Sequence, residues 1–149
     1  MADKAEVVLI GLPKKLIVDG LQAAFNLHVI PRGPEAEAAI AKVAANVRGA
    51  AVTGAPDKMM GDVMARLPKL ELVSSFGVGY DNVDAKYAAA HGITVCNTPE
   101  VLNEEVADTA LGLLLCTVRE FPQAERYLRA GKWLKGGYPL SATLRDRTV

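Results

Sequence analysis

Two glycines, Gly77 and Gly79, stand two residues apart directly after an apolar run that ends at Phe76. Glycine lets the backbone approach a ligand closely, and consecutive N–H groups in a turn form a concavity that binds anions. A dinucleotide loop would need a third glycine at position 82, which is Asn82. The stretch therefore predicts either a site for a small carboxylate, held by the N–H groups of Val78 and Gly79, or a tight structural turn.

Two further apolar runs end in residues that suit a ligand site, namely Thr53-Gly54 and Asn97-Thr98-Pro99. In open α/β sheets, ligands bind beyond the carboxyl ends of the strands. If these runs are parallel strands, their carboxyl ends lie at one edge of the sheet. We therefore expect the glycine stretch and these two turns to contribute to one site.

Asp81, Asn82 and Asp84 place three oxygen-bearing side chains close together, as a metal site would require. Such residues in a turn before a helix are typical of turn formation and capping, because their side chains accept hydrogen bonds from nearby N–H groups. We expect Asp84 to be the N-cap of the next helix, and we predict no metal site.

Short apolar runs alternate with segments of helical periodicity along the first part of the chain. This alternation is typical of βα units around a parallel sheet. The sequence therefore predicts an α/β domain of the flavodoxin-like kind, with a five-stranded parallel sheet and helices on both faces. The expected strands cover residues 6–10, 27–30, 49–53, 70–76 and 93–97, and the expected helices cover residues 14–25, 35–47, 57–67 and 84–91.

After the fifth expected strand, residues 97–121 have the pattern of a long apolar helix, with Asn103 as its N-cap. Its apolar residues cover more than one stripe, which is typical of a connector that packs on two sides. Pro122 ends this helix, and a second helix is expected over residues 123–133. The expected domains are residues 1–99 and residues 100–149.

Charge and composition exclude several classes of function. Lys+Arg and Asp+Glu both number 17, so the chain has no net charge and no basic stripe for a nucleic acid. The longest apolar stretch, residues 110–116, is far shorter than the ~20 residues that span a membrane. We expect no secretory leader and expect Cys96 and Cys116 to be buried free thiols, which fits a cytoplasmic protein.

Three motifs carry a resemblance to a known family: V-G-x-D-N-V-D at residues 78–84, G-I-x-V-x-N-T-P at residues 92–99 and V-A-D-x-A at residues 106–110. With these motifs, residues 70–149 closely resemble the D-isomer-specific 2-hydroxyacid dehydrogenases, especially the glyoxylate/hydroxypyruvate reductase branch. The first 65 residues are similar to the family in layout more than in motif.

The resemblance implies a site for a small 2-oxo acid such as glyoxylate or hydroxypyruvate, which the family reduces to a D-2-hydroxy acid. The N–H groups of Val78 and Gly79 would hold the substrate carboxylate. Val52, Thr53 and Gly54 would line the pocket beside the substrate's side chain.

The resemblance also implies a nicotinamide cofactor, NAD or NADP with NADPH slightly favoured. Thr98 would lie at the domain cleft and Val106 near the nicotinamide. Residues 100–149 would then comprise the interdomain connector helix, a dimerisation arm and the start of the dinucleotide-binding domain. The expected partner is a second copy of the chain, and Trp133 in the arm would line the rim of its pocket.

The family's nucleotide fingerprint and its catalytic arginine, glutamate and histidine are expected beyond Val149. We therefore expect no catalytic residue in this chain, an absent Rossmann domain and no activity of the 149 residues alone. The alternative is a stand-alone small-molecule-binding or dimerisation module without catalysis.

Overall fold

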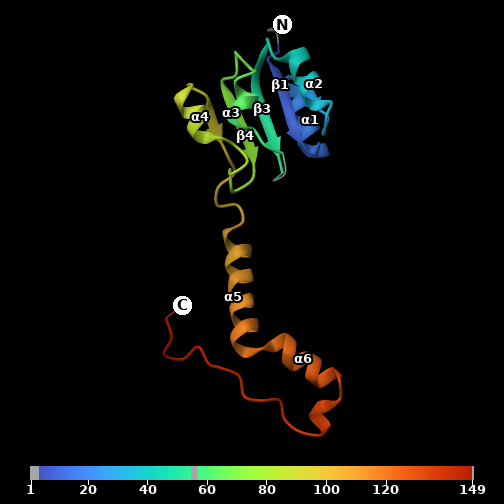
Figure 1. Ribbon diagram of the computed structural model, residues 1–149, viewed down its shortest axis with the longest axis vertical. Coiled ribbons are helices and arrows are strands. Elements are labelled where there is room, and N and C mark those ends of the chain that lie inside the picture. Colours follow the sequence, from blue (N-terminus) through green and yellow to red (C-terminus); the bar gives the residue numbers. More distant parts are fainter. Residues whose placement is uncertain (1–3, 55–56, 149) are drawn as a thin grey trace. The chain divides into compact units, whose positions relative to one another are not determined.

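The structure is a computed structural model that describes residues 4–54 and 57–148 (Figure 1). The chain forms two compact units, Met1–Val101 and Leu102–Val149. The first unit carries the sheet and four helices, and the second carries the remaining helices.

The first unit is an α/β fold with a five-stranded parallel sheet in the order β2-β1-β3-β4-β5. This is the flavodoxin-like strand order, so the predicted fold class is confirmed. The elements are β1 (Glu6–Gly11), α1 (Lys15–Ala24), β2 (Asn26–Ile30), α2 (Ala36–Val43), β3 (Val47–Thr53), α3 (Gly61–Met64), β4 (Leu72–Phe76), α4 (Ala85–Ala90) and β5 (Thr94–Cys96).

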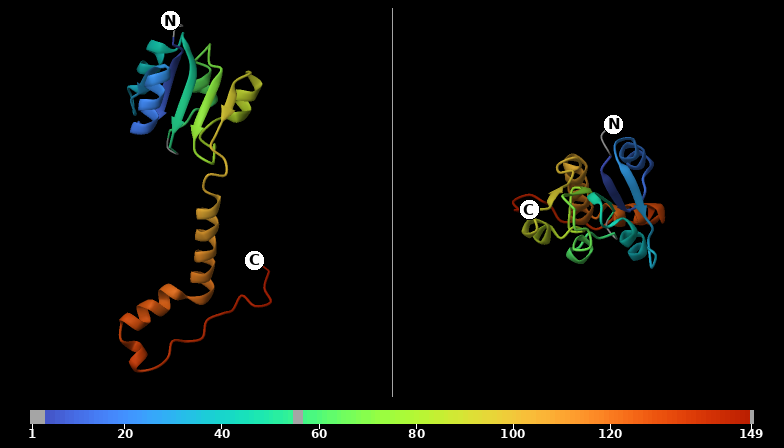
Figure 2. Two further views of the ribbon diagram at one scale, coloured as in Figure 1. Left: turned by 180° about the vertical axis from the view of Figure 1, so that it is seen from behind. Right: turned by 90° about the horizontal axis from the view of Figure 1, so that it is seen from above.

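Helices lie on both faces of the sheet, with α1 on one face and α2, α3 and α4 on the other (Figure 2). Successive residues of a strand point to opposite faces. Val8 therefore belongs to the main hydrophobic cluster under α2, α3 and α4, whereas its neighbour Val7 faces the side of α1. The cluster also includes Ile40 of α2, Met64 of α3 and Ala88 of α4.

The third helix is much shorter than the expected helix over residues 57–67. Met59 instead pairs with Val83 in an isolated parallel bridge. The Met59 N–H donates to the Asn82 carbonyl at 2.7 Å, and the Asp84 N–H donates to the Met59 carbonyl at 3.1 Å. Because both backbone groups of Met59 are used in this bridge, the helix begins only at Gly61.

The Asp84 side chain accepts from the Tyr87 N–H at 2.9 Å, which confirms the predicted N-cap.

The carboxyl ends of β1 and β3 are joined by a close backbone contact at Gly11 and Thr53. The Leu12 N–H donates to the Thr53 carbonyl at 3.2 Å, and the buried Thr53 hydroxyl donates to the Leu12 carbonyl at 2.6 Å. Gly11 has a φ of +118°, and a Cβ atom there would overlap the Thr53 carbonyl oxygen. Only glycine fits this turn.

The second unit consists of α5 (Asn103–Arg119), α6 (Phe121–Arg129) and a short 3₁₀ helix, η1 (Lys132–Leu134). The single helix expected over residues 97–121 is thus shorter, and Asn103 is its first residue rather than its N-cap, which is Leu102. Glu120, with a φ of +54°, separates α5 from α6. No residue of α5 or α6 is buried in the structure.

The described helices include none that is long and apolar enough to cross a membrane.

Both cysteine thiols are free, but Cys96 is exposed and Cys116 is only half-buried, so the expectation that both are buried is wrong. Cys96 is exposed because it ends the short edge strand β5.

The Gly11 turn makes a stability prediction. Gly11→Ala should lower the free energy of unfolding by about 3 kcal/mol, because an alanine would adopt a strained φ and overlap Thr53. Gly20→Ala is the matched control, since no atom lies within 4 Å of a Cβ at Gly20 in α1. This control should stabilise the protein by about 1 kcal/mol through helix propensity. Urea unfolding followed by circular dichroism measures both, and equal midpoints for the two variants would contradict the prediction.

A second prediction concerns pH. The hydrogen bond from the His28 ring, followed by one from the Asn26 side chain, lowers the pKa of Glu6. A lowered carboxylate pKa stabilises the fold above the unfolded pKa of about 4.3, and this contribution is lost as the pH falls through the folded pKa. Between pH 7 and pH 3, the urea midpoint of the wild type should therefore fall further than that of Glu6→Gln. His28→Gln should remove part of the same difference, and parallel pH curves for wild type and Glu6→Gln would refute this role of Glu6.

Candidate functional site

The glycine stretch forms a loop between β4 and α4 whose carbonyl groups are tied to the end of β5. The Gly77 carbonyl accepts from the Thr98 N–H at 3.0 Å. The Val78 carbonyl accepts from the Asn97 side-chain amide at 2.8 Å. Two of the three strand ends expected to contribute to one site are thus joined directly.

Two N–H groups at the centre of the same loop differ from these carbonyls, although the Gly77 N–H donates to the Ser75 carbonyl at 3.1 Å. Among the described residues, the N–H groups of Val78 and Gly79 donate to no protein acceptor. Backbone N–H groups need a partner, and here a ligand or solvent must supply it. Two adjacent free donors on a loop whose carbonyls are fixed suit an anion such as a carboxylate.

The two glycines differ in what a side chain would meet. A Cβ at Gly77 would lie 3.2 Å from the Gly79 carbonyl oxygen, which is tighter than an ordinary contact. A Cβ at Gly79 would lie 3.6 Å from an Asp81 carboxylate oxygen, which is an ordinary contact. The packing of a tight turn accounts for glycine at position 77 but not at position 79, where the missing side chain leaves the N–H groups accessible.

A cavity of about 430 Å³ adjoins this loop. It lies beyond the carboxyl ends of β3 and β4, as expected for an α/β sheet. The Ser75 hydroxyl, which is buried, donates to the Asn82 side-chain oxygen at 3.3 Å and so connects β4 to the far end of the loop. The cavity is lined by Gly54, Lys58, Ser75, Phe76, Gly77, Gly79, Asp81 and Asn82.

The predicted pocket residues of β3 occupy different environments. Val52 is fully buried in the main hydrophobic cluster, and Thr53 is buried with its hydroxyl bound to the Leu12 carbonyl. Gly54, with a φ of +97°, is the one of the three that lines the cavity. Val78 contributes to the loop through its backbone.

The charged residues of the cavity are Lys58 and Asp81, and sequence reasoning missed the first as a site residue. The structure places Lys58 there through the Met59–Val83 bridge, which no local sequence pattern signals. A further cation, Lys14, lies with its Nζ atom 4.6 Å from the centre of the Phe76 ring. The site therefore combines backbone donors, one acid and nearby ammonium groups.

The two residues expected near the cofactor belong to different units. Thr98 follows β5 in the first unit, is half-buried and uses its N–H on the Gly77 carbonyl. Val106 lies on α5 in the second unit with an exposed side chain. Among residues 4–54 and 57–148, no group of three or more His, Cys, Asp and Glu side chains could hold a metal ion.

Neither histidine of the chain lies at this cavity. The His28 ring pairs with Glu6 at the start of β1. The His91 ring stacks on Tyr87 with centroids 3.9 Å apart, and its Nδ1 atom lies 2.8 Å from the Tyr87 carbonyl oxygen. Both histidines have structural roles, and neither can exchange a proton with a ligand on the glycine loop.

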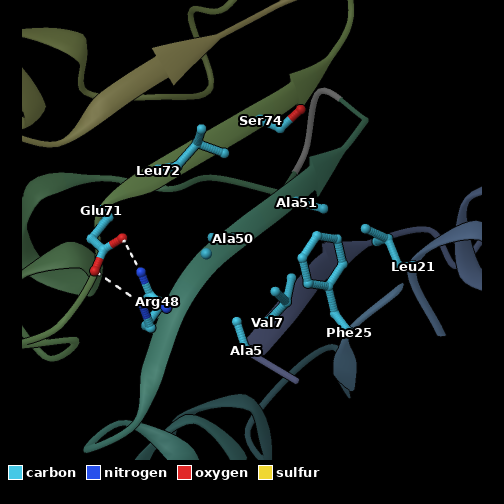
Figure 3. Close-up of a pocket in the computed structure, with 11 residues that line it drawn as sticks. Ala5, Val7, Leu21, Phe25, Arg48, Ala50, Ala51, Glu71, Leu72 and Ser74 are labelled. Carbon is cyan, nitrogen blue, oxygen red and sulfur yellow. Dashed lines mark hydrogen bonds and ion pairs between the residues drawn. The ribbon is translucent and has the colours of Figure 1, made fainter. Parts of the chain in front are cut away.

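A second cavity, of about 480 Å³, lies on the sheet face that carries α1 (Figure 3). Apolar side chains such as Val7, Phe25 and Leu72 dominate its walls. Its charged residues, Arg48 and Glu71, point at each other in a double hydrogen bond of 2.9 and 2.8 Å. This bond lowers the pKa of Glu71. Its charges already pair with each other, and the Ser74 hydroxyl is the other polar side chain on the described walls, so this cavity offers little for acid–base chemistry.

Comparison with known proteins shows which family the chain resembles. The profile of the D-isomer specific 2-hydroxyacid dehydrogenase catalytic domain matches residues 7–146. The chain is 38% identical over 132 residues to glyoxylate/hydroxypyruvate reductase A HPR2 of Arabidopsis thaliana, covering 87% of this chain and 41% of that protein. It is 44% identical over 84 residues to a glyoxylate reductase of Korarchaeum cryptofilum, covering 56% of this chain and 25% of that protein.

A solved structure is similar over nearly the whole chain. The NADPH-dependent glyoxylate/hydroxypyruvate reductase of Sinorhizobium meliloti, in complex with NADP and malonate, superimposes with a TM-score of 0.76 at 45% identity. This match covers 98% of the chain and 45% of the reductase, so the chain spans less than half the length of these relatives. With a family profile matched over residues 7–146, the chain belongs to the D-isomer specific 2-hydroxyacid dehydrogenases.

Proposed function

We propose that the chain is the substrate-binding part of an NAD(P)H-dependent 2-hydroxyacid dehydrogenase that reduces small 2-oxo acids, such as glyoxylate or hydroxypyruvate, to D-2-hydroxy acids. The observation that carries this proposal is the pair of free N–H groups at Val78 and Gly79 beside the cavity. The matched relatives are named glyoxylate and hydroxypyruvate reductases, which supports the same substrate class.

The substrate carboxylate would accept hydrogen bonds from both N–H groups. Bonds from N–H groups to a carboxylate are charge-assisted and about twice as strong as neutral ones. Once the carboxylate is bound, the 2-oxo carbon has a fixed position and orientation, which is the main contribution that a binding domain makes to rate. Gly54 would lie beside the rest of the substrate at the end of β3.

The cofactor supplies a hydride to the 2-oxo carbon when it is bound. The residues of this chain suit the nicotinamide end of such a cofactor but not its phosphates. The glycine pair at the end of β4, Gly77 and Gly79, has Asn82 where a phosphate loop needs a third glycine. We assign Thr98 and Val106 to the nicotinamide end of the cofactor and the remainder to the portion of the relatives that this chain does not span. The relative bound to NADP supports NADPH.

The division of the chain follows from the same proposal. Residues 1–99 would form the substrate-binding domain, and residues 100–149 the connector helix, a dimerisation arm and the start of the dinucleotide-binding domain. The proposal includes a cytoplasmic location, because the two cysteines are free and thiols stay reduced in the cytosol. A stand-alone binding module has less support, because the matched relatives are reductases.

The proposed partner is a second copy of the chain, bound through the second unit. Large apolar side chains are exposed along α6 and η1, including Leu128, Trp133 and Leu134, with Leu134 at 90% exposure. Exposed apolar groups gathered in this way mark an interaction surface more often than a free one.

Substrate binding is tested by Gly79→Val in the complete enzyme. A Cβ atom at position 79 makes only an ordinary contact, and the two further methyl groups of valine are expected to crowd the N–H groups of the loop. Loss of one charge-assisted hydrogen bond costs about 1.5–3 kcal/mol, so the KM for glyoxylate should rise at least ~10-fold. Steady-state oxidation of NADPH measures this effect.

Gly79→Ala should give a smaller rise, because its methyl group covers less of the donors. Thermal unfolding should show both variants within a few degrees of the wild type. An unchanged KM in a folded Gly79→Val enzyme would show that this loop does not bind the substrate carboxylate.

Self-association is tested by Leu128→Glu. Burying a leucine contributes about 1.5–3 kcal/mol, so the dimer Kd of the variant should rise at least ~10-fold. Gln123→Glu adds the same charge to an exposed polar position of α6 and is the matched control. Sedimentation velocity at micromolar concentration measures both, and a monomeric wild type would refute dimerisation through this surface.

A further inference from the structure

Lys58 is held at the wall of the glycine-loop cavity by its neighbour. Met59 is fully buried, and both its backbone groups bond to the segment that closes the loop, at Asn82 and Asp84. The backbone of Lys58 is therefore fixed beside the loop, while its side chain is exposed and lines the cavity. An ammonium group on a long flexible stem can adjust to a ligand from this position.

The charge of Lys58 is not used elsewhere. Among the described residues, Lys58 forms no ion pair, whereas Arg32 pairs with Asp57 and Arg66 pairs with Glu37. Asp57, the acid adjacent in sequence to Lys58, is thus already engaged. Lys58 is the one cation among the residues that line this cavity.

The same cavity also contains an acid, whose negative charge the ammonium group of Lys58 can offset. An Asp81 carboxylate oxygen lies 3.6 Å from where a Cβ of Gly79 would stand, close to the donors that would hold a substrate carboxylate. Like charges at short range weaken binding. The positive charge of Lys58, which lines the same cavity, offsets this repulsion and also attracts any second negative charge on the ligand.

The cavity also has room for more than the smallest substrate. Glyoxylate has two carbons, whereas the cavity of about 430 Å³ extends from Gly79 to Lys58 and Gly54. A ligand held by its carboxylate at the glycine loop would direct its other end into this space.

We propose that Lys58 is a specificity-determining residue that binds a second carboxylate of the substrate, so that the site favours 2-oxo dicarboxylic acids over glyoxylate. The inference rests on the proposed function, because it needs the first carboxylate to bind at Val78 and Gly79. It assigns a substrate class to the site and a role to a residue that the family motifs do not include.

The test compares malonate, with two carboxylates, and acetate, with one, on the isotope-labelled chain by nuclear magnetic resonance. Amide shifts of Val78 and Gly79 report binding at the loop. The wild type should bind malonate about 5-fold more tightly than acetate, since an exposed ion pair contributes up to about that factor. In Lys58→Met the preference should fall below ~2-fold, and it should weaken in wild type as salt is raised.

Lys86→Met is the matched control, because Lys86 is exposed on α4, lies outside the cavity and loses the same charge. It should keep the wild-type preference. Lys58→Gln repeats the test with a polar side chain, so that a folding defect of one variant does not decide the outcome.

The complete enzyme gives a second readout. The ratio of kcat/KM for ketomalonate to that for glyoxylate should fall about 5-fold in Lys58→Met and stay constant in Lys86→Met. If both acids shift Val78 and Gly79 but Lys58→Met keeps the malonate preference, the role of Lys58 is overturned and the loop assignment stands. If neither acid shifts these amides, the proposed function fails and the role of Lys58 fails with it.

Discussion

The site depends on one asymmetry in the glycine loop: the carbonyl groups of Gly77 and Val78 are bonded to the protein, whereas the N–H groups of Val78 and Gly79 have no partner among the described residues. The Thr98 N–H and the Asn97 side chain occupy the carbonyls of Gly77 and Val78. These bonds fix the peptide planes, so the opposite edges of the same planes point their N–H groups away from β5. A loop whose donors were also paired would be a stable turn without a binding function, and a loop without these tethers would lose the geometry that binds an anion.

The sheet supplies the framework for this asymmetry. Parallel pairing brings the ends of β3 and β4 into register, with Thr53 opposite Phe76, and so places Gly54 beside the glycine loop. The Gly11 turn holds the end of β1 against β3 at the same edge. The short Met59–Val83 bridge adds the segment between β3 and α3, although that segment belongs to no sheet. Every element of the site is thus positioned by backbone hydrogen bonds.

The sequence predicted what local chemistry determines. Apolar runs identified all five strands, and the residue type and position of Asp84 identified the cap of α4. It could not predict the Met59 bridge, because the helical spacing of the methionines favours a helix and the competing bonds come from a distant segment. Lys58 was missed for the same reason. Val52 is buried because its side chain points to the face of β3 that packs in the main hydrophobic cluster. Gly54, which follows the last residue of β3, lines the cavity instead.

The residues that line the cavity suit binding of a ligand better than transfer of a proton to it. The cavity contains donors for a carboxylate, the ammonium of Lys58 and the carboxylate of Asp81, but no histidine. His28 and His91 are engaged with Glu6 and Tyr87 away from the loop. Reduction of a carbonyl to a hydroxyl needs a proton at the developing alkoxide, and a histidine tuned near neutral pH is the usual donor. In the proposed reaction the residues of this cavity would bind and orient the 2-oxo acid, and the proton would come from a group outside this cavity.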